Sequence, residues 1–394
     1  MLGSTAEARQ DLEDLVESKI RFTSQGLGSS STHLISAAYA HSTGAPLIQL
    51  LDEDGAALTA LPEIASEDLV SMYEWMLRVR VFDSRLVMLQ RQGRIGFFVP
   101  STGEEAAQIG TAWALRSDDW VFPAYREQGV SLFRGVTFEA LLSQLLGTNL
   151  DGLKGRQMPN HFGSARHRIA IASSPVGTQI PQAVGGAWSA RLRREDSVSV
   201  VYFGDGATST GDFHAGLNFA AVQQLPVVFY CKNNGWAISL PRAKQTRAEF
   251  LTDRAVGYGM PGVRVDGNDI LAVQQVAQQA MEWARSGSGP VFVELVTQRM
   301  GPHSTADDPN RYRDPELMEP WKKRDPIARY RRHLESRGLW SDADEQRLVA
   351  ETESRLLQAI ETVEKSEQPP LSSMFEDVYA ELPWHLREQQ EELG

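Results

Sequence analysis

The chain has 394 residues, of which 42% are hydrophobic and 23% are charged, and its formal net charge is −12. This composition is that of an ordinary globular protein, and the acidic balance excludes a general nucleic-acid binder, which needs a basic face. No apolar run approaches the roughly 20 residues of a membrane-spanning helix, so we expect no membrane segment. The N-terminus lacks the apolar core of a signal peptide, and the single cysteine, Cys231, lies in an apolar run, which suits a reducing cytoplasm.

Residues 1–65 are predicted to form an N-terminal arm with a small hairpin. Residues 24–43 are rich in Ser and Gly and contain few large apolar side chains, which indicates a mobile or partner-draped segment. Residues 47–58 place apolar runs on both sides of Asp54-Gly55, a pattern that favours a hairpin.

The first long helix is predicted from Ser66, because apolar residues recur on one helical face up to Leu89 and Gly93 follows. Two further helices are expected over residues 103–115 and 137–146. Between them, Tyr125-Arg126 follows a proline-fixed turn. A phenol beside a permanent, fork-shaped cation suits recognition of a diphosphate, although a surface salt bridge would explain the pair equally well.

Residues 173–179, SSPVGTQ, come directly before a helix predicted over residues 181–194. Their hydroxyl groups, amide and proline-disrupted carbonyls could coordinate a monovalent cation or hold an aromatic ring. The alternative explanation is a helix start with capping hydroxyls.

The most informative stretch is a strand, helix and strand unit between residues 197 and 239. A buried strand over 198–203 ends in Gly204-Asp205-Gly206, a helix covers 212–223, and a second buried strand over 227–231 ends in Asn233-Asn234-Gly235. The carboxyl ends of parallel strands open on one edge of a sheet, so we expect Asp205 and Asn234 to converge there. Two oxygen ligands are too few for a calcium cage but suit magnesium, which also binds waters and cofactor phosphates.

Glycines in this unit allow the backbone to approach phosphates closely. A dinucleotide fingerprint would need a third glycine where Ser209 stands, and the Gly-Lys-Ser/Thr of a phosphate loop is absent. The pattern instead resembles the thiamine diphosphate motif, in which GDG at the end of one strand is followed after 26 residues by NN at the end of the next.

The alternation continues with a strand over 263–266, a helix over 270–285 and a strand over 291–296. It predicts an α/β fold over residues 66–330, with a single doubly wound, mostly parallel sheet flanked by helices. The loop that follows the last strand carries His303, a candidate proton-transfer group, although a lone loop histidine is usually only solvated. Residues 331–394 are predicted to be a helical extension.

Taken in order, these pieces resemble the alpha subunit of the thiamine diphosphate-dependent branched-chain 2-oxoacid dehydrogenase, the decarboxylating first component of that complex. The resemblance runs from about Ser66 to the C-terminus. Its markers are YRE from Tyr125, KGRQMP from Lys154, SSPVGTQIPQAVG from Ser173, GDGATSTGD, KNNGWAIS, GPHSTADD and the terminal MFEDVY.

The resemblance implies a full set of site residues. The magnesium ligands fall on Asp205, Asn234 and the carbonyl of Trp236, and a structural potassium site falls on Ser173, Pro175, Thr178 and Gln179. Diphosphate contacts fall on Tyr125, Arg126, Lys232 and His303, aminopyrimidine contacts on Ser174 and Val176, and further cofactor contacts on Gly204, Gly206 and Ala207. His303 also matches the histidine that assists reductive acylation of the lipoyl group.

The resemblance also shows departures from the family pattern. Ala124 replaces a polar residue of mammalian relatives, Lys232 stands where they carry Arg, and Trp236 replaces Tyr. The first two changes put individual phosphate contacts in doubt. Ser304 matches a regulatory phosphorylation position of mitochondrial relatives.

The resemblance implies partners as well. The family's catalytic Glu lies on a second α/β domain, and this chain contains one such domain, so a beta subunit should supply the acid in an assembly of two alpha and two beta chains. A lipoyl-bearing acyltransferase and a branched-chain 2-oxoacid substrate are expected, in a bacterial cytoplasm. The alternatives are a pyruvate dehydrogenase alpha subunit and, from another class, a non-catalytic scaffold of the same fold.

Overall fold

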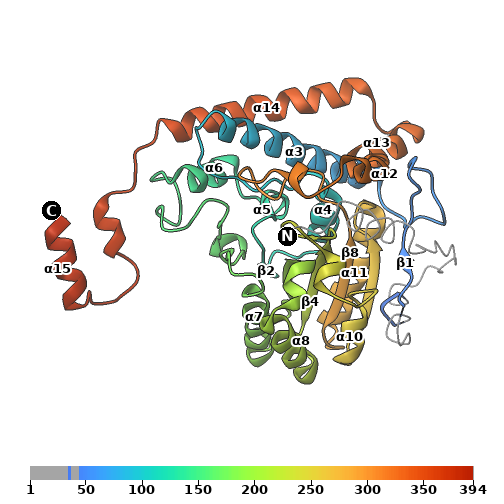
Figure 1. Ribbon diagram of the computed structural model, residues 1–394, viewed down its shortest axis with the longest axis horizontal. Helices are drawn as coiled ribbons and strands as arrows, with labels where there is room; N and C mark the ends of the chain where they lie inside the picture. The colour runs from blue at the N-terminus through green and yellow to red at the C-terminus, as the bar shows by residue number, and fades with distance from the viewer. Residues whose placement is uncertain (1–33, 37–43, 394) are drawn as a thin grey trace.

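The protein is described by a computed structural model that covers residues 34–36 and 44–393. Its centre is a six-stranded sheet in the order β1-β7-β8-β4-β3-β2, and every neighbouring pair of strands is parallel. Figure 1 shows the sheet between two layers of helices. The strands are β1 (Leu47–Ile48), β2 (Trp120–Phe122), β3 (Ser199–Gly204), β4 (Val227–Asn233), β7 (Gly262–Asp266) and β8 (Val291–Val296).

Alternate side chains of the central strands β3 and β4 enter different hydrophobic clusters, because successive residues point to opposite faces of a sheet. Val200 and Tyr202 of β3 join a cluster with helices α3 (Ser66–Arg91), α4 (Glu105–Trp113) and α11 (Ile270–Arg285). Val201 and Phe203 join a second cluster with α7 (Gln179–Arg193) and α8 (Gly211–Gln223). Helices therefore cover both faces, which confirms the predicted doubly wound α/β fold.

An outer layer of helices lies over α3 and α4 (Figure 1). In the figure α14 (Asp342–Glu364) runs along the outside of α3 and α6 (Phe138–Leu146), while α15 (Trp384–Leu393) lies away from the sheet. The remaining helices and strands are α5 (Gln128–Phe133), α9 (Arg242–Gln245), α10 (Asp253–Gly257), α12 (Glu319–Lys323), α13 (Pro326–Ser336), β5 (Trp236–Ala237) and β6 (Leu240–Pro241). None of the described helices is both long and apolar enough to cross a bilayer.

Neither edge strand was predicted as part of the main sheet, although β1 falls within the predicted hairpin over residues 47–58. β2 is a three-residue strand beside β3, and it brings Tyr125 to the same edge as the ends of β3 and β4. β1 pairs with β7, and the N–H groups of Leu50 and Leu51 both donate to the buried carboxylate of Asp269 at 2.7 Å. The turn after β1 is closed by an antiparallel bridge between Leu51 and Ala57.

The division of the chain at residues 65 and 330 remains a prediction. β1 lies within the segment predicted as an arm, yet it belongs to the main sheet. Residues 1–33 and 37–43, which include most of the predicted mobile segment, lie outside the described residues.

Candidate active site

The site lies at the carboxyl edge of β3 and β4. These strands pair in parallel with Gly204 opposite Lys232, so Asp205 and Asn234, which follow the two pairing positions, emerge on the same edge. Asp205 begins a short 3₁₀ turn, Asp205–Ser209, and Asn234 begins the turn into β5. A Cβ added at Gly206 would come within 3.0 Å of the Ala237 Cβ, so a larger residue here would require the neighbouring turn to shift.

A cavity of about 430 Å³ opens at this edge. It is lined by eleven of the predicted residues: Tyr125, Arg126, Ser174, Val176, Gly204, Gly206, Ala207, Lys232, Asn234, Trp236 and His303. The structure thus brings together side chains that are up to 178 positions apart, between Tyr125 and His303. Glu104, His161 and Arg299 also line the cavity but were not predicted.

Asp205 is fully buried, and neither of its carboxylate oxygens has a hydrogen-bond partner among the described residues. Burial raises the pKa of this carboxyl to about 7, against the opposing effect of its own backbone N–H and of Arg242. Its carbonyl oxygen, in contrast, accepts hydrogen bonds from Thr208 Oγ1 and Gln245 Nε2 at 2.7 and 2.6 Å. A buried carboxylate without a partner is costly, so this site fits a cation that would complete it.

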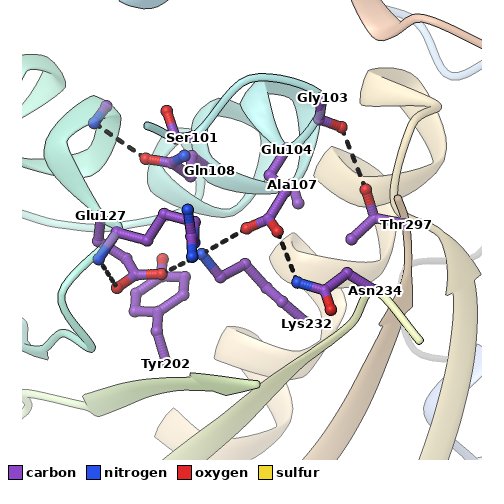
Figure 2. A network of polar contacts seen from close by, with 12 residues as sticks. Ser101, Gly103, Glu104, Ala107, Gln108, Glu127, Tyr202, Lys232, Asn234 and Thr297 are labelled. Atoms are coloured by element: carbon purple, nitrogen blue, oxygen red, sulfur yellow. Dashed lines mark hydrogen bonds and ion pairs between the residues drawn. The ribbon is translucent and has the colours of Figure 1, made fainter. Parts of the chain in front are cut away.

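Asn234 belongs to a polar network that is completed by protein atoms (Figure 2). Its Nδ2 donates to Glu104 Oε1 at 2.9 Å, and its Oδ1 accepts from the backbone N–H of Trp236 at 3.2 Å. The ammonium of Lys232 pairs with Glu104 Oε2 at 2.9 Å and also with Glu127. Burial alone would raise the pKa of Glu104, but Lys232 and Arg126 lower it to about 2.

Lys232 therefore contacts two carboxylates in the structure. Burial would lower the pKa of its ammonium, whereas Glu104 and Glu127 raise it, and the net direction is upward. A direct contact between Lys232 and a diphosphate remains a prediction.

Arg126 and Arg299 make the cavity wall cationic. Arg126 donates to the carbonyls of Pro100 and His303, and Arg299 donates to Ile238 O at 2.9 Å and Tyr312 Oη at 3.0 Å. Neither guanidinium forms an ion pair with a carboxylate of the described residues. Both are buried, at 5% and 1% exposed, so this wall of the cavity suits an anion.

His303 lies between these two guanidiniums. Its Nδ1 is 3.4 Å from both Arg126 Nη2 and Arg299 Nη1, and its ring meets the Tyr125 ring edge-on at 5.8 Å. Burial, Arg126 and Arg299 lower the pKa of His303 to about 4, so the imidazole is neutral near pH 7. Asp307 accepts the His303 backbone N–H at 2.7 Å and fixes the loop.

His161 sets the polarity of Ser174. The carbonyl of Pro159, 3.0 Å from His161 Nδ1, can only accept a hydrogen bond, so Nδ1 carries the proton. Nε2 lies 2.6 Å from the Ser174 hydroxyl and, when it carries no proton, accepts a hydrogen bond from it. The Ser174 oxygen is left with lone pairs, which suits an N–H donor in the cavity.

The residues predicted to bind potassium lie at the entry to α7. Gln179 Nε2 donates to Tyr202 O at 2.9 Å, and its Oε1 has no partner among the described residues. Thr178 is the residue before the helix, and its hydroxyl makes no capping bond. Ser173 and Pro175 precede them in the same loop, and their role as ligands remains a prediction.

Four residues of the candidate site escaped the sequence reasoning, namely Glu104, Glu127, His161 and Arg299. Glu104 and Glu127 each stand just before a helix, α4 and α5, where an acid is ordinarily explained by the helix dipole. Arg299 could have been found from the sequence, because it follows the end of β8 by three residues and ligands bind at the carboxyl ends of parallel strands. His161 lies in a glycine-rich loop that offers no periodicity.

Comparison with known proteins assigns the family. Residues 73–372 match the family described as dehydrogenase E1 component. The chain belongs to this family. It is 46% identical over 352 residues to 2-oxoisovalerate dehydrogenase subunit alpha 1, mitochondrial, of Arabidopsis thaliana, covering 89% of this chain and 74% of the relative. Dehydrogenase E1 components of this kind depend on thiamine diphosphate, which confirms the predicted fold family and enzyme class.

Other E1 alpha subunits show comparable similarity. The Dictyostelium discoideum 2-oxoisovalerate dehydrogenase subunit alpha is 42% identical over 352 residues, covering 88% of this chain and 80% of the relative. The Homo sapiens subunit is 40% identical over 355 residues, covering 89% and 80%. The resemblance predicted from the motifs is confirmed by these relatives.

The predicted bacterial cytoplasmic location is wrong. The named relatives from plant, slime mould and mammal are all mitochondrial subunits, which points to a mitochondrial location. The prediction rested on the N-terminal residues and on one buried cysteine, and neither feature distinguishes two reducing compartments.

Proposed function

We propose that this chain is the alpha subunit of a branched-chain 2-oxoacid dehydrogenase E1 component, which decarboxylates branched-chain 2-oxoacids and transfers the acyl group to the lipoyl group of an acyltransferase. The main support for a cofactor site is the buried carboxylate of Asp205, which has no hydrogen-bond partner among the described residues and lies beside a cationic cavity. The substrate class is supported by 40–46% identity to 2-oxoisovalerate dehydrogenase alpha subunits.

The residues present fit magnesium and thiamine diphosphate. Asp205, the oxygen of Asn234 and the carbonyl of Trp236 would be the magnesium ligands, since magnesium takes a few protein oxygens together with phosphates and water. Tyr125, Arg126 and His303 would bind the diphosphate, with Arg299 as an additional cation. Further cofactor contacts would come from Ser174, Val176, Gly204, Gly206, Ala207 and Lys232, and a potassium ion would bind Ser173, Pro175, Thr178 and Gln179.

When bound, thiamine diphosphate would supply the nucleophilic carbon and the electron sink. The chain's own groups would orient it and hold protons. Arg126 and Arg299 would neutralise the diphosphate, and this anion would offset the positive field that keeps the pKa of His303 low. His303 could then gain a proton and donate it at the acyl-transfer step. Ser174, with its proton held by His161, would accept an N–H of the aminopyrimidine.

The site requires a beta subunit under this proposal. Thiamine catalysis needs a carboxylic acid on a ring nitrogen of the aminopyrimidine, and the described part of the chain contains one parallel sheet of this fold. Ser174, Pro175 and Val176 are exposed where the cofactor would leave this chain, with Val176 at 51%. We expect the shared site to lie in a symmetric assembly of two alpha and two beta chains.

The test is reconstitution with the beta subunit, thiamine diphosphate and magnesium. We expect decarboxylation of 3-methyl-2-oxobutanoate with a higher kcat/KM than pyruvate, and no turnover by this chain alone. A preference for pyruvate would favour the pyruvate dehydrogenase alternative. Full activity of the isolated chain would refute the shared site, and absence of magnesium-dependent cofactor binding in the complete assembly would indicate a non-catalytic scaffold.

A further inference from the structure

The polar network around Lys232 joins three separate parts of the fold (Figure 2). Lys232 lies on β4, Glu104 stands before α4, and Glu127 stands before α5. The side chains of Lys232, Glu104 and Glu127 are 5%, 0% and 1% exposed. Ion pairs this deeply buried are held in one geometry, because a charge removed from its partner would be left in an apolar interior.

The backbone around Glu104 is equally constrained. The Glu104 N–H donates to Ser101 O at 2.9 Å, and the Gln108 N–H donates to Glu104 O at 3.2 Å. The neighbouring Gly103 carbonyl accepts from Thr297 Oγ1 at 3.2 Å, which ties the start of α4 to the end of β8 (Figure 2). The Glu104 carboxylate is therefore fixed from both its backbone and its charged end.

This carboxylate determines which way the Asn234 amide points. A carboxylate paired with an ammonium only accepts hydrogen bonds, so the group that faces it from Asn234 must be the NH₂. The Nδ2 to Oε1 distance is 2.9 Å, and Figure 2 shows the Asn234 oxygen on the side away from Glu104. The Trp236 N–H, 3.2 Å from Oδ1, holds that oxygen from the other end and leaves it a second lone pair.

We propose that Glu104, clamped by Lys232, is a positioning residue that fixes the Asn234 amide with its oxygen available as a metal ligand. Lys232 then serves the metal site through Glu104. The proposal rests on the proposed magnesium site and deepens it. Without this clamp the amide could rotate and present its NH₂ to the cation, which a metal site does not tolerate.

The proposal predicts that a second change at position 234 compensates for the change at position 104, which a purely structural role of Glu104 does not. In Glu104→Gln the new amide can donate as well as accept, so the Asn234 orientation is no longer fixed. In Asn234→Asp a second carboxylate faces Glu104 and the two repel. In the double variant the new amide at position 104 can donate to one oxygen of the new carboxylate at position 234. The other oxygen is left for the metal, and the network charge is restored.

The measurement is the affinity of Mn²⁺ for the full-length chain assembled with its beta subunit, in the presence of thiamine diphosphate, from the electron paramagnetic resonance signal of free Mn²⁺. We expect Glu104→Gln and Asn234→Asp each to weaken Mn²⁺ binding about 10- to 100-fold, the usual cost of losing a group that orients a ligand. The double variant should return to within about tenfold of the wild type. Glu319→Gln, which removes an exposed Glu–Lys pair, is the matched control and should change nothing.

Wild-type affinity in Glu104→Gln, or a double variant that binds no more tightly than either single variant, would overturn the proposal. If Glu104→Gln does not fold, Asn234→Asp and the double variant still decide the question, because a merely structural role of Glu104 gives no recovery of Mn²⁺ affinity in the double variant. Asp205→Ala tests the proposed metal site separately from the positioning role of Glu104. Unchanged Mn²⁺ affinity in Asp205→Ala would contradict the proposed metal site, and with it the positioning role of Glu104. If Asp205→Ala loses Mn²⁺ binding but Glu104→Gln binds Mn²⁺ as the wild type does, the metal site stands and only the role of Glu104 is contradicted.

Discussion

Two buried acids at the same edge of the sheet have opposite surroundings. Glu104 has an ammonium and an amide as partners, and its pKa falls to about 2. Asp205 has no partner for either oxygen among the described residues, and its pKa rises to about 7. Both are fully buried, so burial alone does not account for the difference.

The difference separates a completed part of the protein from an incomplete one. Around Glu104 the sequence supplies every counter-charge, which is the pattern of a structural network. Around Asp205 the described residues supply no direct partner, and the free energy cost of burying that carboxylate is offset more fully when a cation binds. The carboxylate that looks less stable is therefore the one that identifies the functional site.

The largest expected effect comes from removing the incomplete acid. Asp205→Ala should lower magnesium-dependent thiamine diphosphate affinity by roughly a hundredfold to several thousandfold, because the cation loses the one charged ligand proposed for it and a buried charge without its partner costs about 3–5 kcal/mol. Isothermal titration calorimetry with the complete assembly measures this. The apo protein should not be destabilised, since the deleted carboxylate has no partner to lose.

Asp212→Ala is the matched control, because Asp212 is an exposed acid on the neighbouring helix α8. Near-normal cofactor affinity in Asp205→Ala would contradict the assignment of this carboxylate.

The network of Lys232, Glu104 and Glu127 should be destabilised by loss of a charge, in contrast to the site of Asp205. Lys232→Met leaves two buried carboxylates facing each other, and we expect the free energy of unfolding to fall by about 3 kcal/mol or more. Lys322→Met removes an exposed ammonium of the Lys322–Glu319 pair, at 66% and 63% exposure, and should cost less than about 1 kcal/mol. Equal losses in urea denaturation would show that the buried network is not structural.

Asp83 offers a third buried acid that sharpens the comparison. Burial and the neighbouring Glu105 raise its pKa to about 7, although Ser101 donates to Oδ2 from both its N–H and its hydroxyl. Between pH about 4 and 7 the folded state retains a proton that the unfolded state has released, so Asp83 makes stability fall as pH rises through that window, by up to about 1.4 kcal/mol per pH unit.

Asp83→Asn keeps the oxygen that accepts from Ser101 but removes this titration. Free energies of unfolding at pH 4.5 and pH 7 should therefore differ less in the variant than in the wild type, with the gain at pH 7. Asp68→Asn, an exposed acid on the same helix, is the control. An unchanged pH slope in Asp83→Asn would show that this carboxyl is ionised throughout the range.

The smallest expected effect concerns His303 and is a loss of about 100-fold in the rate of lipoyl acylation. His303→Ala should reduce lipoyl acylation by that amount because a positioned proton donor is lost. Decarboxylation with an artificial electron acceptor should fall less, since only one contact to the diphosphate disappears. The control is His214→Ala on exposed α8 surface. Equal losses in the two assays would contradict a separate role in acyl transfer.

The sequence predicted the centre of the fold well because its strands and helices have clear local patterns of apolar residues. β3 and β4 are apolar runs that stop at glycine and asparagine, and α8 and α11 have boundaries within a residue of those predicted. β2 and the pairing of β1 with β7 were missed because strands of two and three residues contain no measurable alternation.

The site was predicted where chemistry follows a strand end and missed where it depends on contacts across the chain. Asp205 and Asn234 are marked by their strands. The contact of Glu104 with Asn234 spans 130 positions, and that of His161 with Ser174 lies between two loops. Lys232 was correctly placed in the cavity, but its two carboxylate partners depend on how α4 and α5 pack against β4.

The central claim is that Asp205 and Asn234 jointly hold the metal of a bound cofactor. The most direct measurement is a crystal structure of the complete assembly soaked with thiamine diphosphate and Mn²⁺, with anomalous scattering to locate the metal. We predict one Mn²⁺ peak per alpha chain within about 2.0–2.3 Å of an Asp205 oxygen and of Asn234 Oδ1, the distance range of hard oxygen ligands. A cofactor bound in the cavity with its metal peak away from Asp205 would contradict the account.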